Sequence, residues 1–230
     1  MGVTQETLRQ QLEHTLAGTD LPGLGAPERC GSHDIYDLGD YALLVVTDRV
    51  CQGTRTLGTA PFKGEAVTRL ATWWLNETAD LAESPIEKIV DPQALLVRKI
   101  EPLGCLFSAH AFLSGDLWAA YQTGFRCESA LTDGMTRDQP LTQPVATPLT
   151  RVGGLSTHRA VVNETGMAAP LLGRACKLAL RLFERACQLG QQRGVTLRDS
   201  LYTFGVLADG ELGVVALLHA PPHHDLLPRR

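Results

Sequence analysis

The side chains best suited to acid/base chemistry in this 230-residue chain are its seven histidines. Imidazole titrates near neutral pH and can serve as acid, base or metal ligand. His110 ends a predicted strand, and we expect it to bind a ligand or transfer protons; a satisfied, buried structural histidine is the alternative. His33 and Asp34 are adjacent on another predicted strand, so their side chains point to opposite faces and cannot easily pair.

The C-terminal histidines could bind a metal ion and a cysteine could act as a nucleophile, but each of these groups also has a simpler structural interpretation. His219, His223, His224 and Asp225 carry metal-binding atoms. A Pro-flanked tail with histidines is more often solvated, and we therefore predict no metal site. The six cysteines are scattered without a CxxC pair, which favours reduced, mostly buried thiols. Cys51 is a candidate nucleophile, but no base can be assigned to it, so a packed thiol is preferred.

Charged residues at element boundaries suggest where an anion would bind. Lys63, Gly64 and Glu65 stand at the start of a predicted helix, where backbone N–H groups favour anions. The alternative is that Glu65 is only a favourable acid in the first turn. Arg98 and Lys99 occupy successive strand positions, so only one of them can face a cleft.

Periodicity and turn residues predict the elements that position these groups. Helices are predicted at residues 4–17, 64–80, 117–122 and 171–189, and strands at 35–36, 41–47, 88–90, 95–100, 104–110, 201–206 and 213–218. Leu38-Gly39-Asp40 and Asp209-Gly210 predict two hairpins. Residues 128–160 are rich in Thr, Pro, Gly and Asp without a sustained period, so we expect a long ordered loop of the kind that is commonly functional.

Bulk composition excludes several classes of partner. The net charge of -4 is spread along the chain, without the basic patch of a protein that binds nucleic acid or an anionic membrane. No segment approaches the ~20 apolar residues that span a bilayer. The polar N-terminus lacks the pattern of a signal peptide, so we expect a cytoplasmic protein without membrane or nucleic-acid partners.

Ordered strings along the chain closely resemble the motifs of the SAICAR synthetases, and the resemblance covers roughly residues 29–225 in the family's order and spacing. The strings are His33–Asp37, Thr47–Arg49, Pro61–Glu65, Leu96–Lys99 with Glu101–Leu103, Leu113–Gly115 with Trp118 and Tyr121, Thr147–Pro148, and Asp199 with Phe204–Gly205 and Asp209–Leu212. One such string would be weak evidence. Eight in register favour membership of this family.

The resemblance implies an α/β (α+β) fold of two lobes with a central cleft. Residues 1–102 would form an N-terminal helix and a β-rich lobe, and residues 103–230 an α/β lobe containing the long loop. Family enzymes use ATP and magnesium to activate the carboxylate of an aminoimidazole ribonucleotide and couple it to aspartate. A small-molecule nucleotide partner and a homodimer or larger assembly are implied. The resemblance assigns substrate or nucleotide binding to Asp48, Arg49, Lys63, Gly64, Glu65, Arg98, Lys99 and Ser114.

The chain departs from the family pattern where metal and ATP are bound. Where the family has a lysine and a glutamate in one strand, this chain has Leu201 and Thr203, and the acidic pair of the last strand becomes Ala216 and Leu217. Leucine and alanine side chains cannot coordinate magnesium, which prefers oxygen ligands. The hinge acid near the adenine falls at Leu106. We therefore expect no metal site and no cofactor requirement, with use of magnesium and ATP disfavoured.

Histidines stand at several of the altered positions. His33, His110 and His158 replace family residues, and with Asp199 they are the catalytic candidates, although Asp199 has a structural alternative. The favoured hypothesis is a repurposed enzyme that modifies a purine- or imidazole-derived ribonucleotide without ATP-driven ligation, such as a ring-rearranging or ring-expanding step in nucleoside antibiotic biosynthesis of the pentostatin or coformycin type. The alternatives are an ATP- and magnesium-dependent SAICAR synthetase and a non-catalytic nucleotide-binding protein.

Overall fold

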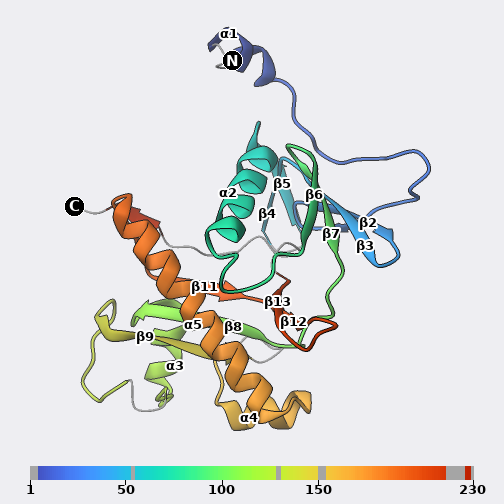
Figure 1. The fold of residues 1–230 in the computed structure, drawn as a ribbon. Helices are drawn as coiled ribbons and strands as arrows, with labels where there is room; N and C mark the ends of the chain where they lie inside the picture. Colours follow the sequence, from blue (N-terminus) through green and yellow to red (C-terminus); the bar gives the residue numbers. More distant parts are fainter. Residues whose placement is uncertain (1–4, 53–54, 128–130, 150–153, 216–225, 229–230) are drawn as a thin grey trace. The chain divides into compact units, whose positions relative to one another are not determined.

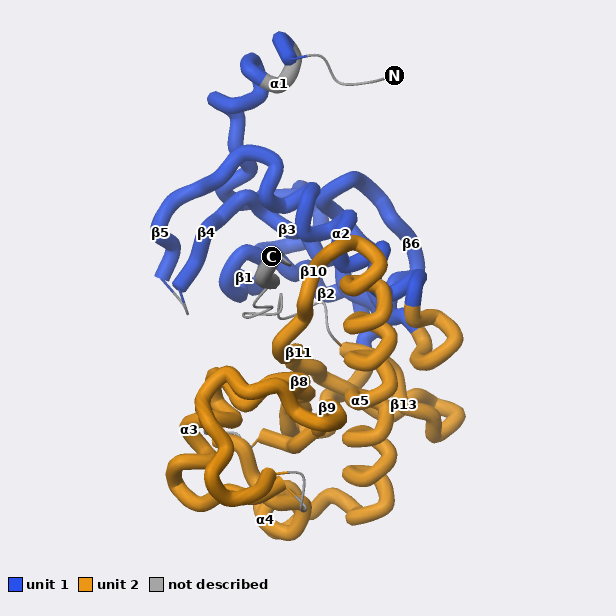
Figure 2. The backbone as a smooth tube through the Cα atoms, turned by 90° about the vertical axis from the view of Figure 1, so that its left-hand side faces the viewer, with its two compact units in different colours: residues 1–77, 84–99 blue, residues 78–83, 100–230 orange. Residues whose placement is uncertain are grey.

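The computed structural model describes the chain except residues 1–4, 53–54, 128–130, 150–153, 216–225 and 229–230 (Figure 1). The chain divides into two compact units, which Figure 2 distinguishes by colour. Unit 1 consists of residues 1–77 and 84–99, and unit 2 consists of residues 78–83 and 100–230. The predicted mixed α and β architecture is confirmed.

Unit 1 is built on a five-stranded antiparallel sheet with the order β1-β2-β3-β7-β6. Its strands are β1 (Glu28–Cys30), β2 (His33–Leu38), β3 (Tyr41–Val46), β6 (Ile86–Asp91) and β7 (Ala94–Arg98). The predicted hairpin between β2 and β3 is confirmed, and Gly39 takes the positive φ of 83° that its turn requires. Tyr36, Leu44 and Leu95 are fully buried, so the core of this unit lies on the central strands.

A second hairpin and two helices complete unit 1. Strands β4 (Arg49–Gln52) and β5 (Arg55–Thr59) pair antiparallel. Helix α2 (Lys63–Glu77) packs against β3, close to the predicted range. Helix α1 (Gln5–Gln11) is shorter than the predicted 4–17, because the chain turns out of the helix near Leu12. Leu12 is exposed, so no packing holds the predicted last turns in a helix.

Unit 2 contains a three-stranded antiparallel sheet with the order β11-β8-β9 and three helices. The strands are β8 (Leu106–Phe112), β9 (Pro140–Leu149) and β11 (Asp199–Tyr202), and the helices are α3 (Gly115–Gln122), α4 (His158–Thr165) and α5 (Ala169–Gln192). Two small pairs accompany them, β10 (Val195–Leu197) with β14 (Leu226–Pro228) and β12 (Phe204–Val206) with β13 (Leu212–Val214). The hairpin predicted at Asp209-Gly210 joins β12 to β13.

Helix α5 supplies one wall of this unit. Its buried residues recur at three- and four-residue spacing, including Leu172, Ala175, Ala179, Leu182 and Ala186, and this stripe makes the helix amphipathic. Figure 1 shows α5 lying across β8 and β9, which it contacts. Leu113, Leu117, Tyr121, Leu131 and Val145 form a separate buried cluster around α3.

Two predictions about unit 2 are wrong in part. The predicted loop at 128–160 contains β9 and the first residues of α4, so regular structure occupies much of it. The strand predicted at 201–206 is divided between β11 and β12, which pair with different partners. In the part of the chain that the structure describes, every helix is too short or too polar to cross a membrane.

Candidate ligand-binding site

The register of the β11-β8-β9 sheet brings polar side chains to one face. His110 on β8 lies opposite Asp199 on β11, and Ser108 lies opposite Thr147 on β9. Directly opposed residues of an antiparallel pair share a face, as do residues two apart in one strand. Ser108, His110, Thr147 and Asp199 therefore lie on one side of the sheet, which we call the polar face.

The other side of the same sheet is apolar and is covered by α5. Phe107 and Ala109 are fully buried, and Tyr202 lies opposite Phe107. Burial raises the pKa of Tyr202, and the nearby Cys187 of α5 contributes in the same direction. Val145, opposite His110, packs in the cluster around α3 instead. One side of the sheet is thus apolar and lies under α5, whereas the other combines the polar residues with the apolar contact of Val145 to the α3 cluster.

His110 is the most buried of the titratable residues on the polar face. It is 2% exposed, and its Nε2 lies 2.7 Å from Ser108 Oγ. Burial lowers the pKa of His110 to about 4, because the charged imidazolium loses its hydration. The ring is therefore neutral at neutral pH. Its second nitrogen, Nδ1, has no hydrogen-bond partner within the described residues.

Two hydroxyl groups near His110 are also buried without a partner. Thr147 Oγ1 and Ser114 Oγ make no hydrogen bond to any described residue, and the two residues are 2% and 3% exposed. Ser114 occupies the N-cap of α3, yet its side chain does not cap the helix. A Cβ built on the next residue, Gly115, would lie 4.0 Å from Asp199 Oδ2, so this helix start adjoins the polar face.

Unpartnered polar atoms of this kind are costly to a folded protein. Each buried donor or acceptor left without a partner costs about 1–3 kcal/mol. Two of them, His110 Nδ1 and Thr147 Oγ1, belong to residues of the polar face, and Ser114 Oγ belongs to the N-cap of α3. Arg198 Nε, from the residue before Asp199, is a further buried atom without a partner among the described residues. Native structures leave few such groups unsatisfied, and clusters of them mark places where water or a ligand is bound. The polar face, together with Ser114, is therefore the best candidate for a ligand-binding site.

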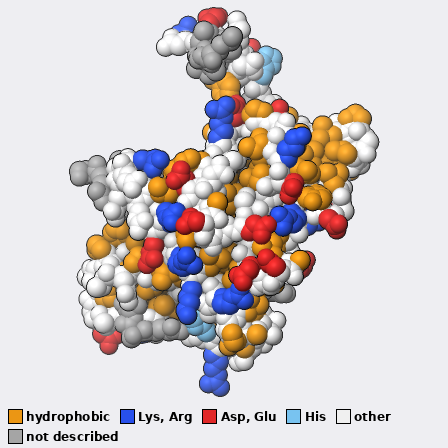
Figure 3. Space-filling model, viewed as in Figure 1, with side chains coloured by type: hydrophobic (Ala, Val, Ile, Leu, Met, Phe, Trp, Pro, Cys, Tyr) orange, Lys and Arg blue, Asp and Glu red, His pale blue; other side chains and the backbone are white. Residues whose placement is uncertain are grey.

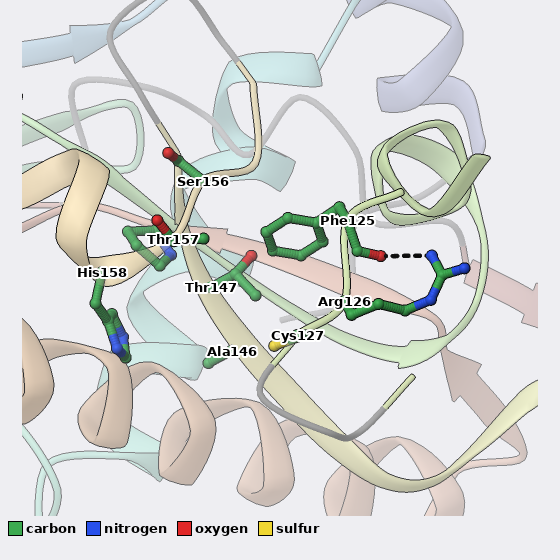
Figure 4. A pocket seen from close by; sticks show the side chains of 9 residues that line it. Phe125, Arg126, Cys127, Ala146, Thr147, Ser156, Thr157 and His158 are labelled. Atoms are coloured by element: carbon green, nitrogen blue, oxygen red, sulfur yellow. Dashed lines mark hydrogen bonds between the residues drawn. The ribbon is translucent and has the colours of Figure 1, made fainter. Parts of the chain in front are cut away.

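A small pocket borders this region on the side of α4. Its cavity volume is about 40 Å³, and it is lined by residues that include Thr147, Phe125, Cys127 and His158. Figure 4 shows the His158 ring pointing toward a helix rather than toward Thr147 and Phe125. Consistent with that view, His158 Nε2 lies 3.2 Å from Cys176 Sγ on α5. His158 thus connects α4 to α5, apart from the His110–Ser108 pair.

In unit 1 the predicted anion site at the start of α2 holds a carboxylate of the chain itself. Asp48 Oδ1 accepts a hydrogen bond of 2.8 Å from Gly64 N and one of 3.3 Å from Gln93 Nε2. Its other oxygen accepts a 2.8 Å bond from Leu16 N. Glu65 forms an ion pair of 2.6 Å with Arg69 one turn later. The negative charge that the helix end favours is thus supplied by Asp48.

Arg49 is likewise engaged by its own chain. Its guanidinium lies 2.7 Å from Asp34 Oδ1 and donates hydrogen bonds to the backbone carbonyls of Ala17, Gly31 and His33. Burial raises the pKa of Asp34, but hydrogen bonds from Arg49 and Thr19 outweigh it, so the net pKa lies below its ordinary value. His33, the residue before Asp34 in the sequence, is also buried. This arrangement ties the segment before β1 to the sheet.

The remaining candidates of unit 1 lie at its surface. Arg98 is 4.0 Å from Glu87, and Lys99 is 2.5 Å from Asp37, with all four side chains substantially exposed. Basic and acidic side chains are interspersed on the face of the molecule that Figure 3 shows, in keeping with the small net charge. A cavity of about 480 Å³ near the start of α2 is lined by residues that include Asp48, Glu65 and His14.

The structure thus brings together only part of the predicted site. His110 and Asp199 lie opposite each other in unit 2, and Gly115, the residue after Ser114, adjoins Asp199. By contrast, His158 is turned toward α5 and His33 belongs to unit 1. The candidates His219, His223, His224 and Asp225 lie outside the described residues, as do Ala216 and Leu217. Sequence reasoning missed Ser108 and Thr147. For Ser108 the signal was available, because a residue two positions before His110 on a strand shares its face.

Comparison with known proteins decides the family. A family model described as SAICAR synthetase matches residues 31–218. The chain belongs to the SAICAR synthetase family. A phosphoribosylaminoimidazole-succinocarboxamide synthase of Legionella pneumophila (strain Lens) is 32% identical over 216 residues, which cover 90% of this chain and 69% of that protein. The chloroplastic synthase of Vigna aconitifolia is 29% identical over 228 residues, or 95% of this chain and 67% of that protein.

The solved structures show the same fold. The SAICAR synthase of Saccharomyces cerevisiae has a TM-score of 0.77 with 20% identity, covering 87% of this chain and 75% of that one. A SAICAR synthetase solved with ADP has a TM-score of 0.68 with 12% identity, covering 82% of this chain and 78% of that one. The chain spans about two thirds of the length of the two synthases compared above.

These relatives overturn the favoured functional hypothesis. An ATP-independent enzyme of nucleoside antibiotic biosynthesis was expected because the metal and ATP positions are altered. The relatives compared are instead all SAICAR synthases, and they match across nearly the whole chain. The hypothesis was wrong because it gave more weight to substitutions at a few positions than to similarity over the rest of the chain. The ligase alternative is the better supported one.

Proposed function

We propose that the chain catalyses the SAICAR synthetase reaction, in which ATP activates the carboxylate of an aminoimidazole ribonucleotide and aspartate then forms an amide with it. The observation that carries the proposal is the family match over residues 31–218. The names of the relatives support it, and so do the titles of two structural neighbours, one complexed with SAICAR and one with ADP.

The chemistry has two balanced steps. A carboxylate oxygen forms a bond to the γ-phosphorus of ATP while the bond to ADP breaks. The aspartate amine then attacks the carbonyl carbon, inorganic phosphate leaves, and the nitrogen loses a proton. Positioning accounts for most of the catalysis in such transfers, because bound reactants are already close and aligned.

The polar face offers groups for this positioning. His110 Nδ1, Thr147 Oγ1 and Ser114 Oγ are available as hydrogen-bonding atoms among the described residues. They lie in a buried place where water competes little, so each bond to a substrate constrains its orientation more strongly than it would at the surface. The neutral His110 ring can either donate or accept there, since its tautomer is set by Ser108 and by the ligand.

Magnesium does not fit the residues that the structure describes. Among them there is no group of three or more His, Cys, Asp or Glu side chains that could hold a metal ion. Leu201 lies opposite Ser108 on the polar face and offers no oxygen ligand. The proposed reaction consumes ATP, whereas the sequence led us to expect a protein that requires neither magnesium nor ATP; no observation tests that expectation, and the ligase assay does so directly.

The test is a reconstitution with the full chain. The carboxylated aminoimidazole ribonucleotide, aspartate and ATP are incubated with and without magnesium, and SAICAR and ADP are quantified by liquid chromatography and mass spectrometry. We expect equal amounts of SAICAR and ADP that depend on all three substrates. The synthase of Legionella pneumophila serves as the positive control. Absence of product under conditions in which that enzyme is active would refute the proposal.

The cellular location and the oligomeric state belong to the same proposal. We propose a cytoplasmic location. We also propose a homodimer or larger homo-oligomer, as the family resemblance implies. Light scattering coupled to size-exclusion chromatography should give at least twice the chain mass of 24.9 kDa. A mass equal to one chain across the micromolar range would contradict the second of these.

A further inference from the structure

We propose that Cys176 is a site of oxidation by small peroxides, with His158 as the base that takes the proton of its thiol. The two residues belong to α5 and α4, and His158 Nε2 lies 3.2 Å from Cys176 Sγ. A thiol and an imidazole at hydrogen-bonding distance form the kind of pair that activates cysteine nucleophiles. The proposal is independent of the ligase reaction, because neither residue belongs to the polar face.

The packing of the two helices holds this pair together. His158 is the first residue of α4, and the side chain of Thr157 caps the helix by accepting a hydrogen bond of 3.3 Å from Ala160 N. Val161 in the same helix is fully buried, and α4 contacts α5. The cap and the buried valine fix the start of α4, so the His158 ring is held in the direction that Figure 4 shows.

The imidazole, and not exposure to solvent, distinguishes Cys176 from two other cysteines of unit 2. Cys176 is 7% exposed and Cys105 is 5% exposed. Burial raises the pKa of Cys105 to about 11, and burial together with Glu184 raises the pKa of Cys187 on α5 to about 11. Among the described residues, neither Cys105 nor Cys187 forms a hydrogen bond with a histidine. These two thiols are therefore expected to be inert in the folded protein.

The reaction balances with a peroxide as the only co-reactant. The Cys176 sulfur attacks one oxygen of hydrogen peroxide, the O–O bond breaks, and a sulfur–oxygen bond forms. His158 takes the thiol proton and returns it to the departing hydroxide, which leaves as water. The sulfur is oxidised to a sulfenic acid while the peroxide is reduced. Because burial disfavours a free thiolate, a base that removes the proton during the attack is needed to make this thiol reactive.

There is room for a small oxidant around the pair. Gly173 lies one turn before Cys176 on α5, and a Cβ built on Gly173 would meet nothing within 4 Å. His158 also lines the cavity of about 40 Å³, a volume that holds about three water molecules. Hydrogen peroxide, with two oxygen atoms, is no larger than this, whereas glutathione disulfide is far larger. The available space therefore favours hydrogen peroxide as the oxidant.

The experiment measures the oxidation of each cysteine in the native full chain. The protein is treated with hydrogen peroxide for set times, catalase stops the reaction, and unfolding in dimedone traps sulfenic acids for peptide mass spectrometry. Cys105 and Cys187 are internal controls. His158→Gln keeps a hydrogen-bonding side chain but removes the base. His14→Gln is the matched control variant, because His14 is an exposed residue of unit 1.

We expect Cys176 to be oxidised at least about tenfold faster than Cys105 or Cys187, because a positioned base contributes at least that much to proton transfer. In His158→Gln the rate at Cys176 should fall about tenfold, towards that of Cys105. In His14→Gln it should equal the wild-type rate. Glutathione disulfide should leave Cys176 unmodified in all three proteins.

Partial unfolding of a variant cannot imitate this result. Opening of unit 2 exposes Cys105 as well as Cys176, so the rate at Cys176 is expressed relative to the rate at Cys105. Equal rates at Cys176 and Cys105 in wild type, an unchanged ratio in His158→Gln, or modification of Cys176 by glutathione disulfide would overturn the proposal. Since oxidation is measured without substrates or turnover, its outcome and that of the ligase assay are separate.

Discussion

Replacement of Arg49 by leucine should destabilise unit 1 strongly. The Arg49 and Asp34 side chains are 8% and 0% exposed, and their charged atoms lie 2.7 Å apart. Breaking a buried ion pair by removing one partner costs about 3–5 kcal/mol, because the other charge stays buried without compensation. In a chain of this size that corresponds to a decrease in Tm of roughly 6–20 °C. The measurement is thermal unfolding followed by circular dichroism.

A surface pair on the same unit is the control. Arg69 and Glu65 are separated by only 2.6 Å, but the Arg69 side chain is 73% exposed. Arg69→Leu should therefore cost less than about 1 kcal/mol. The double variant Arg49→Leu with Asp34→Asn should lose less than the sum of the two single variants, since it leaves no buried charge unpaired.

The Arg49→Leu penalty should depend on pH in a defined direction. The pKa of Asp34 in the folded protein lies below its ordinary value, so the pair stabilises the protein above the unfolded-state pKa and loses this contribution as pH falls through the folded one. The difference between wild type and Arg49→Leu should be full at pH 7 and should shrink below about pH 4. A penalty under 1 kcal/mol at pH 7, or one that is equal at pH 7 and pH 3, would refute the reasoning.

Other consequences of the packing can be tested with single substitutions. Gly64→Ala should destabilise by about 1–3 kcal/mol in urea unfolding, because its Cβ would come within 2.1 Å of both Val46 O and Gln93 Nε2. Gly173→Ala is its control: a Cβ there meets nothing within 4 Å, so this helical glycine should instead gain about 0.5–1 kcal/mol. Burial raises the pKa of Cys105 to about 11, so its thiol should resist iodoacetamide at pH 8 in native protein and react after denaturation, as peptide mass spectrometry would show; rapid native alkylation would contradict this.

The elements that sequence predicted well are those specified by local pattern. The apolar stripe of α5 repeats over many turns and therefore identifies both the helix and its buried face. Gly39 and Gly210 adopt positive φ values of 83° and 84° in hairpin turns, where glycine is the favoured residue. Such features need no knowledge of the distant chain.

Strand β9 was missed because its prolines were taken as signs of a loop. Pro144 and Pro148 have the same parity along the regularly paired part of the strand, so the N–H groups they lack can both face away from β8. The carbonyl of Pro148 accepts a hydrogen bond from Ser156 N, which confirms that its backbone polar groups point to the open side. Because β9 is an edge strand, these missing donors interrupt no ladder. Position in the sheet, which sequence alone does not reveal, decided the outcome.

The candidate site was predictable residue by residue but not as an arrangement. Family motifs marked Ser114 and Asp199, and the chemistry of imidazole marked His110. Their association depends on the pairing of β11 with β8, two segments that lie about ninety residues apart in sequence. Thr147 joined the site only through the register of β9, a strand that had been predicted to be a loop.

The motif residues of the two units have different consequences for ligand binding. In unit 1, Asp48 and Arg49 use their charged atoms for bonds within the chain, so binding a ligand through them would first require those bonds to break. In unit 2, His110 and Thr147 hold polar atoms for which the described residues provide no partner. A satisfied group stabilises the fold, whereas an unsatisfied one destabilises it until a ligand binds. Substitution of Arg49 should thus lower stability, and substitution of Thr147 should lower affinity while stability is maintained.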